Sequence, residues 1–286
     1  MKKRIEMFLF FSINDVNHFK SSLKDMLRSG KITTTNQLLR VEDQPDTLVN
    51  IAFSQTGLTG LGVHDSLNDT FFAAGQFSDA SFLGDPGTAN WVQAFKGTNI
   101  HGVFLLASDD SSHIHDEMSQ INEQFRSSIS TQYTLQGQVR PGDQEGHERE
   151  LLYICDAQTI ADICADFGYM DGISQPGVTG FTAHPTPGQT VIDPGHILLG
   201  ETGDVVSRPA WAKDGSFLAF RQLKQLVPEF NKFLTDNPIM VPGLTPQQGS
   251  DLMGARMVGR WKSVSHHPST AQQTFLSRAS FTSIYI

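Results

Sequence analysis

Asp171 is the residue of this chain whose surroundings best suit chemistry. It lies in Phe-Gly-Tyr-Met-Asp-Gly-Ile-Ser-Gln-Pro, residues 167–176, a stretch with no other charge. Glycine permits backbone torsions and close approaches that other residues do not, so Gly168 and Gly172 place the carboxylate on a tight excursion of the chain. Two interpretations stay open: a turn residue that hydrogen-bonds its own backbone, or a catalytic acid aimed into a cavity.

Six further blocks, spread along the chain, accompany this motif in a recognisable order. They are residues 50–58, 83–87, 137–142, 194–200, 214–221 and 257–263. Together with the spelling G-x-x-D-G-[IV]-S-x-P, they resemble the dye-decolorizing (DyP-type) haem peroxidases, and most closely the fungal branch. The resemblance extends over nearly the whole chain, although the segment after Ser263 does not share it.

The resemblance implies a fold, a cofactor and a role for Asp171. The family is an α+β barrel of two ferredoxin-like units, with haem b in the second. Asp171 would be the distal catalytic residue, which takes a proton from the near oxygen of bound peroxide and returns it to the far oxygen. Gly168 and Gly172 would let the backbone approach the porphyrin, with Ile173 and Ser174 beside it, so these four residues and Asp171 are the predicted cofactor-binding set.

The family's metal ligand is not predicted in this chain. Its axial histidine and distal arginine follow the Gly-Arg-Trp-Lys-Ser block, where this sequence continues with an unrelated tail. His266 and His267 lie in that Ser/Thr/Gln-rich tail and are interpreted as solvated. The other histidines do not match the ligand position either: His18, His64, His101, His113, His115, His147, His184 and His196.

Two departures from the family pattern suggest one hypothesis. In the family, Gly-His-Glu runs almost directly into the Asp171 motif, but here residues 149–166 separate the motif from Gly-His-Glu at 146–148. The second departure is the segment 264–286, which does not resemble the family. Both would be explained by unspliced introns in the gene model, and the genomic sequence decides this. Cys155 and Cys164 would then be intron-coded; their spacing fits no zinc pattern and does not establish a disulfide.

Composition and charge limit the classes of partner that the chain can bind. The net charge of −9 argues against nucleic acid, and no segment is long enough to cross a membrane. Lys2, Lys3 and Arg4 before an apolar run superficially resemble a signal peptide, but the run is short and lacks a cleavage site, which favours a buried strand. Localisation stays open, since relatives are often secreted. The one glycosylation sequon, Asn68-Asp69-Thr70, matters only if the protein is secreted.

Hydrophobic periodicity predicts the strands and helices, and the resemblance implies that they form two units followed by a tail. Strands at 7–13, 48–54, 100–108 and 131–139, with helices at 14–29 (capped by Asn14) and 110–128, give the βαββαβ order of a ferredoxin-like unit over 1–145. Residues 64–98 are predicted to be mostly loop. A partial second unit over 146–263 would contain a strand at 216–222 and helices at 227–236 and 248–258. Residues 264–286 form the tail.

The leading functional hypothesis is therefore a DyP-type peroxidase that uses hydrogen peroxide to oxidise dyes and phenolic aromatics. We expect weak or no haem binding and impaired activity in the chain as written. The alternatives are an inactive barrel fragment and a haem-binding protein without turnover. Several aromatic residues are candidates for relaying electrons from bulky dyes, although ordinary packing is the favoured interpretation for each of them. They are Trp91, Trp211, Trp261, Tyr133, Tyr153 and Tyr169.

Overall fold

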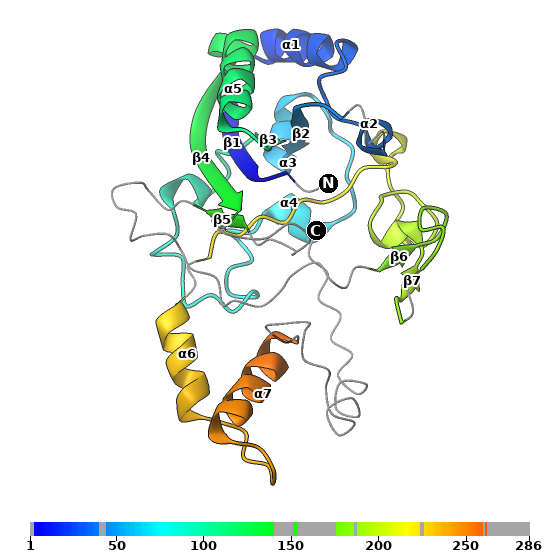
Figure 1. The fold of residues 1–286 in the computed structure, drawn as a ribbon. Helices are drawn as coiled ribbons and strands as arrows, with labels where there is room; N and C mark the ends of the chain where they lie inside the picture. Colours follow the sequence, from blue (N-terminus) through cyan, green and yellow to red (C-terminus); the bar gives the residue numbers. More distant parts are fainter. Residues whose placement is uncertain are drawn as a thin grey trace. The chain divides into compact units, whose positions relative to one another are not determined.

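The computed structural model describes residues 3–39, 44–139, 151–153, 176–185, 188–223, 226–259 and 261 (Figure 1). Its contacts divide the chain into two compact units. The first contains residues 1–138 and 193–217, and the second contains residues 139–192 and 218–286. Segment 193–217 thus belongs with the N-terminal part, although it lies far along the chain.

The first unit is built on an antiparallel sheet with the strand order β2-β3-β1-β4. Its strands are β1 (Ile5–Ile13), β2 (Thr47–Phe53), β3 (Gly102–Ser108) and β4 (Ile129–Val139), and its long helices are α1 (Val16–Arg28) and α5 (Ser111–Phe125). This sequence of elements is βαββαβ, so the predicted ferredoxin-like unit and each of its six elements are confirmed.

Helices α1 and α5 cover one face of that sheet. Successive strand residues point to opposite faces, so Leu9 and Phe11 of β1 share the face of Phe104 in β3. Phe19 of α1 and Phe125 of α5 meet them, with ring centroids 5.6 Å apart for Phe11 and Phe19 and 5.2 Å apart for Phe104 and Phe125. Figure 1 shows both helices on the same side of the sheet.

The cap of α1 corrects one prediction. Asp15, not Asn14, is the N-cap: its Oδ1 accepts a hydrogen bond from the backbone N–H of His18 at 3.0 Å. Both residue types suit this position, so composition does not separate them. Asn14 instead donates from its side chain to Ser130 Oγ at 2.7 Å, which ties the start of the helix to β4.

The loop after α1 pairs with the outer strand of the sheet. The N–H of Thr33 donates to the carbonyl of Val49 at 2.8 Å, and the N–H of Val49 donates to Thr33 Oγ1 at 2.9 Å. Thr33 is buried. Strand β2 stands at the end of the strand order, so this exchange satisfies backbone groups that an edge strand would leave open.

Several short elements went unpredicted because one or two turns give too little periodicity. They are α2 (Thr35–Leu39), α3 (Gln55–Gly60) and the 3₁₀ turns η2 (Arg126–Ser128), η4 (Pro194–His196) and η5 (Ala210–Ala212). The stretch 64–98, predicted to be mostly loop, holds only α4 (Thr70–Ala74) and η1 (Gln93–Phe95) as helical turns.

The second unit confirms two predicted helices and contradicts one strand. It contains β5 (Leu151–Tyr153), β6 (Gly177–Val178), β7 (Val191–Ile192), α6 (Val227–Asp236) and α7 (Pro246–Val258). The strand predicted at 216–222 is wrong, since these residues are irregular. Their alternation fits a half-buried strand, but a strand also needs a partner backbone, which a local pattern does not reveal.

Helix α7 is hydrogen-bonded to α6 and to the loop that follows α6. The Ser250 hydroxyl donates to the carbonyl of Leu234, and the N–H of Ile239 donates to the carbonyl of Gly249 at 3.0 Å. In the parts of the chain that the structure describes, none of the helices combines the length and apolar character that crossing a bilayer requires.

Core packing of α1 gives a matched pair of tests. Phe19 is fully buried, whereas Leu27 of the same helix is 57% exposed. We expect Phe19→Ala to lower the free energy of unfolding by about 3–5 kcal/mol, because it removes buried surface and leaves a cavity. Leu27→Ala should change it by about 0.5 kcal/mol or less. Urea denaturation followed by circular dichroism measures both, and equal losses would contradict the assigned packing.

Candidate functional site

The predicted site residues lie outside the described residues. This holds for Asp171 and for Gly168, Gly172, Ile173 and Ser174, and also for the segment 154–166 that precedes them. Their roles stay predictions. The structure does describe the chain that leaves the motif and most of the blocks that accompany it in sequence.

The motif leads directly into a hydrogen-bonded strand. Gly177 of β6 donates its N–H to the carbonyl of Thr190 at 2.7 Å, and Thr179 donates to the carbonyl of Ile192 at 2.9 Å. Gly177 is buried, and a Cβ there would lie 3.3 Å from Val191 Cγ2. The C-terminal end of the Asp171 motif is therefore anchored two residues after Gln175.

Two blocks of the sequence pattern pack against each other within the first unit. Leu199 of the 194–200 block donates its N–H to the carbonyl of Gly215 at 2.8 Å and accepts from the N–H of Asp214 at 3.0 Å. Ser216 Oγ donates to the carbonyl of Ile197 at 3.0 Å. The two blocks are therefore a single structural feature, separated in the sequence by the chain that loops between them.

A buried ion pair holds that loop. Arg208 Nε donates to Asp204 Oδ2 at 2.9 Å, with side chains only 8% and 5% exposed. Arg208 also donates to the carbonyl of Leu67 and lies over the ring of Phe217, 5.6 Å from its centroid. The guanidinium of Arg208 and the backbone N–H of Gly200 lower the pKa of Asp204 to about 2.

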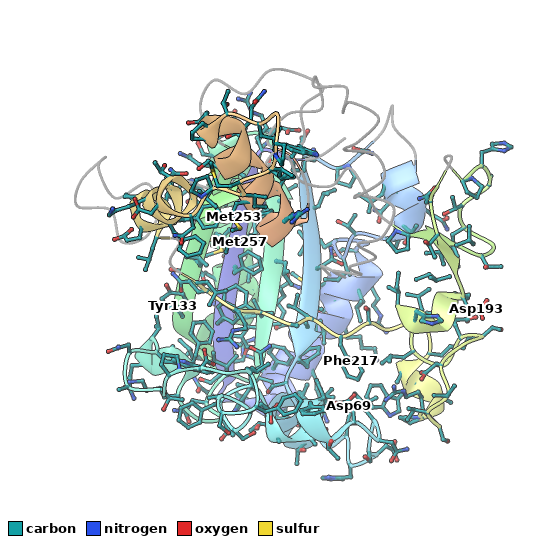
Figure 2. The ribbon with its side chains drawn as sticks, turned by 90° about the horizontal axis from the view of Figure 1, so that it is seen from below. Asp69, Tyr133, Asp193, Phe217, Met253 and Met257 are labelled. Carbon is teal, nitrogen blue, oxygen red and sulfur yellow. The ribbon has the colours of Figure 1, made fainter. Side chains whose placement is uncertain are left out.

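Residues 65–72 make further hydrogen-bond and ring contacts with residues 207–217. Trp211 Nε1 donates to Asp65 Oδ2 at 3.1 Å, and the rings of Phe72 and Phe217 are 5.3 Å apart. Figure 2 labels Phe217 and Asp69, the residue whose side chain caps the helix of Phe72. We call residues 65–72 with 207–217 the N-terminal seam.

The block at 50–58 owes its glycine to a close backbone approach. Ser54 caps α3 by accepting from the N–H of Gly57 at 3.0 Å, and its hydroxyl donates to the carbonyl of Ile100 at 2.7 Å. A Cβ built on Gly57 would lie 1.9 Å from the carbonyl oxygen of His101. Packing thus accounts for Ser54 and Gly57 of this block.

The described histidines do not form a ligand set. His101 is structural: its Nδ1 accepts the N–H of Ile13 at 3.0 Å, and burial lowers its pKa, so the ring is a neutral acceptor. His196 is exposed beside the carbonyl of Asp193, at 3.1 Å from its Nδ1. In the part of the chain that the structure describes, no three His, Cys, Asp or Glu side chains are grouped as metal ligands require. His147, His266 and His267 lie outside it.

The candidate relay aromatics occupy different surroundings. Tyr133 packs against Phe10 and Phe95 with centroids 6.3 and 5.3 Å away, and Trp91 packs edge-on against Phe77 at 5.8 Å. Trp211 is 47% exposed. Trp261 has a buried indole nitrogen, which lacks a hydrogen-bond partner in the described structure. The side chain of Tyr153, and Tyr169 as a whole, lie outside the described residues.

Besides the Asp204–Arg208 pair, sequence reasoning missed the ion pair of Lys31 with Glu117 and the buried Glu6. Lys31 Nζ donates to both carboxylate oxygens of Glu117, at 3.0 and 3.1 Å, beside a surface cleft of about 380 Å³. The available signal was the position of Glu117 on the apolar face of its helix, three residues after Ile114 and four before Ile121. Glu6 of β1 has its pKa raised by burial, opposite Ala107 and Gly137.

Comparison with known proteins first defines the class. Residues 1–141 match the family model described as the DyP dimeric alpha+beta barrel domain. This stretch belongs to that family, which agrees with the ferredoxin-like order of its strands.

The relatives then define the particular group, and the predicted resemblance is confirmed. Peroxidase 2 of Mycetinis scorodonius is 54% identical over 266 residues, which are 92% of this chain and 48% of that protein. The crystal structure of a decolorizing peroxidase from Auricularia auricula-judae is 46% identical with a TM-score of 0.78, over 91% of this chain and 54% of that one.

A third relative is known with a small aromatic molecule. A dye-decolorizing peroxidase in complex with 2,6-dimethoxyphenol is 45% identical with a TM-score of 0.80, over 92% of this chain and 56% of that chain. The chain is thus a relative of the fungal dye-decolorizing peroxidases and spans about half the length of the proteins it matches.

The approach of Gly57 to His101 predicts that a Gly→Ala substitution lowers the free energy of unfolding at one position of α3 but not at another. Gly57→Ala should lower the free energy of unfolding by about 1–3 kcal/mol or more, because the methyl group overlaps a backbone oxygen. Gly60 of the same helix faces open space, and Gly60→Ala should be neutral or stabilise by up to about 1 kcal/mol. Thermal denaturation compares the two, and tolerance of Gly57→Ala would refute the close approach.

The Asp204–Arg208 pair predicts a pH-dependent stability. Because the folded pKa of about 2 lies below the ordinary value of 3.8, the pair contributes fully above about pH 4 and loses its contribution as the pH falls towards 2. Asp204→Asn should lower the melting temperature at pH 7, with a difference from wild type that shrinks below pH 4.

Another i,i+4 pair is the control for this experiment. Lys232 and Asp236 lie 2.7 Å apart, but their side chains are 75% and 53% exposed. Asp236→Asn should shift the melting temperature little, because solvent screens an exposed pair. Equal effects of the two substitutions, or a pH-independent effect of Asp204→Asn, would contradict the assignment.

Proposed function

We propose that this chain forms part of a DyP-type haem peroxidase that uses hydrogen peroxide to oxidise dyes and phenolic aromatics. The observation that carries the proposal is 54% identity over 92% of the chain to a fungal peroxidase, together with the Gly-x-x-Asp-Gly motif at 168–172. The 2,6-dimethoxyphenol bound by one relative supports phenols as the reducing substrates.

In this proposal Asp171 is the acid–base residue. Its carboxylate would accept a proton from one oxygen of hydrogen peroxide and return it to the other oxygen, which is the acid–base work that cleavage of the peroxide bond requires. The group must be ionised when peroxide arrives, because only the carboxylate form can accept the proton. Gly168 and Gly172 supply the close backbone approach.

Haem b is the proposed cofactor, and one feature of the described structure bears on its fit. Trp261 keeps a buried indole N–H without a hydrogen-bond partner in the described structure, and a buried donor is costly unless it meets an acceptor. The carboxylates of haem are acceptors of this kind. Gly168, Asp171, Gly172, Ile173 and Ser174 would hold the porphyrin, whose iron supplies the two-electron reduction of peroxide when bound.

A chimera tests the role of Asp171. The chain through Ser263 is joined to the segment of Mycetinis scorodonius peroxidase 2 that follows the matched region. Haem is supplied during expression. We expect a haem absorption band and peroxide-dependent oxidation of 2,6-dimethoxyphenol. Asp171→Asn should lower kcat by about 10²–10⁴-fold with an unchanged band, because it removes the proton acceptor but leaves the backbone in place.

The control makes the same change of charge elsewhere. Asp156→Asn alters a carboxylate in the 149–166 segment, which the resemblance does not include, and should leave kcat within a few-fold. Retained activity in Asp171→Asn would overturn the assigned role. A haem band without turnover in the unmutated chimera would favour haem binding alone, and the absence of a band would favour an inactive barrel fragment.

A further inference from the structure

We propose that Asn68 is an N-glycosylation acceptor and that its glycan covers the exposed apolar surface formed by Phe71 and Phe82. The proposal is independent of the peroxidase site, since all of these residues belong to the first unit. The modification needs the sequence Asn-x-Ser/Thr with any residue but proline between, and Asn68-Asp69-Thr70 is its one occurrence in the chain.

The local structure presents this sequon outward. Asn68 and Thr70 are both exposed, and Asn68 adopts φ +56°, the left-handed conformation that asparagine tolerates better than most residues. Asp69 starts helix α4 directly afterwards, accepting the N–H of Phe72 at 2.8 Å. The sequon therefore occupies a sharp corner of the chain immediately before a helix, on the surface of the N-terminal seam.

The hydrogen bond of Asn68 is compatible with a glycan. Its Nδ2 donates to the carbonyl of Ser207 at 2.7 Å, and a side-chain amide carries two N–H donors. Transfer from a polyprenyl-pyrophosphate-linked oligosaccharide forms the bond from Nδ2 to sugar C1 and breaks the bond from C1 to the pyrophosphate oxygen. The polyprenyl pyrophosphate leaves, the transferase takes one amide proton, and the second N–H still donates to Ser207.

Two exposed aromatic rings that follow Asn68 in the sequence pair with each other. Phe71 is 54% exposed and Phe82 is 75% exposed, with ring centroids 5.3 Å apart. Grouped apolar side chains at a surface mark a site that something else covers. A bulky hydrophilic glycan attached three residues before Phe71 provides such a cover.

Occupancy is tested by translating the full chain, with an N-terminal signal sequence attached, in the presence of endoplasmic-reticulum microsomes. The wild type and Thr70→Ser keep the sequon and should each gain one endoglycosidase-sensitive shift in mass. Thr70→Ala keeps Asn68 and its bond to Ser207 but removes the sequon, and it should lose the shift, as should Asn68→Gln. An unmodified wild-type chain overturns the proposal.

The covering role has its own test on the glycosylated, purified chain. Trimming the glycan to its first sugar should raise the fluorescence of a dye that binds apolar surface. The double variant Phe71→Ser/Phe82→Ser carries the same glycan but lacks both rings, and trimming should leave its signal unchanged. No rise in the wild type, or an equal rise in the double variant, shows that the glycan does not cover this surface.

Discussion

The first unit depends on the contact between two helices and one face of an antiparallel sheet. Phe11 and Phe104 from the sheet meet Phe19 and Phe125 from the helices, and all four are fully buried. Because aromatic rings bring large apolar area in defined relative orientations, this cluster orders four separate elements at once. The Ser54–Gly57 corner and the pairing of Thr33 with Val49 are attached to strands that the cluster holds in place.

The order of strands and helices could be predicted because each element buries one stripe of its own residues. Phe19 and Met26 recur at helical spacing, and Leu9 and Phe11 alternate as a half-buried strand requires. The strand predicted at 216–222 failed where the needed information is not local: alternation shows which face is apolar but not whether a partner strand is adjacent. The choice of Asp15 over Asn14 as a cap failed for a related reason, since both side chains suit the position.

The candidate site also has a part that could be predicted from the sequence and a part that could not. The motif around Asp171 could be recognised because its spelling, together with six further blocks in order, resembles the DyP-type peroxidases; the residues of the motif alone left a simple turn open. The pairing of Asp204 with Arg208, and the return of 193–217 to the first unit, follow no periodicity. Arg208 also donates to the carbonyl of Leu67, which is more than a hundred positions away, and only the folded chain brings these two residues together.

Thr33 also bears on how copies of the chain meet. Strand β2 ends the strand order of its sheet, and an unpaired outer strand is a template on which a second chain can add its own strand. By exchanging hydrogen bonds with Val49 from both its backbone and its hydroxyl, Thr33 occupies that template with the chain's own loop. This contact leaves less of the outer edge of β2 open to a strand from another molecule.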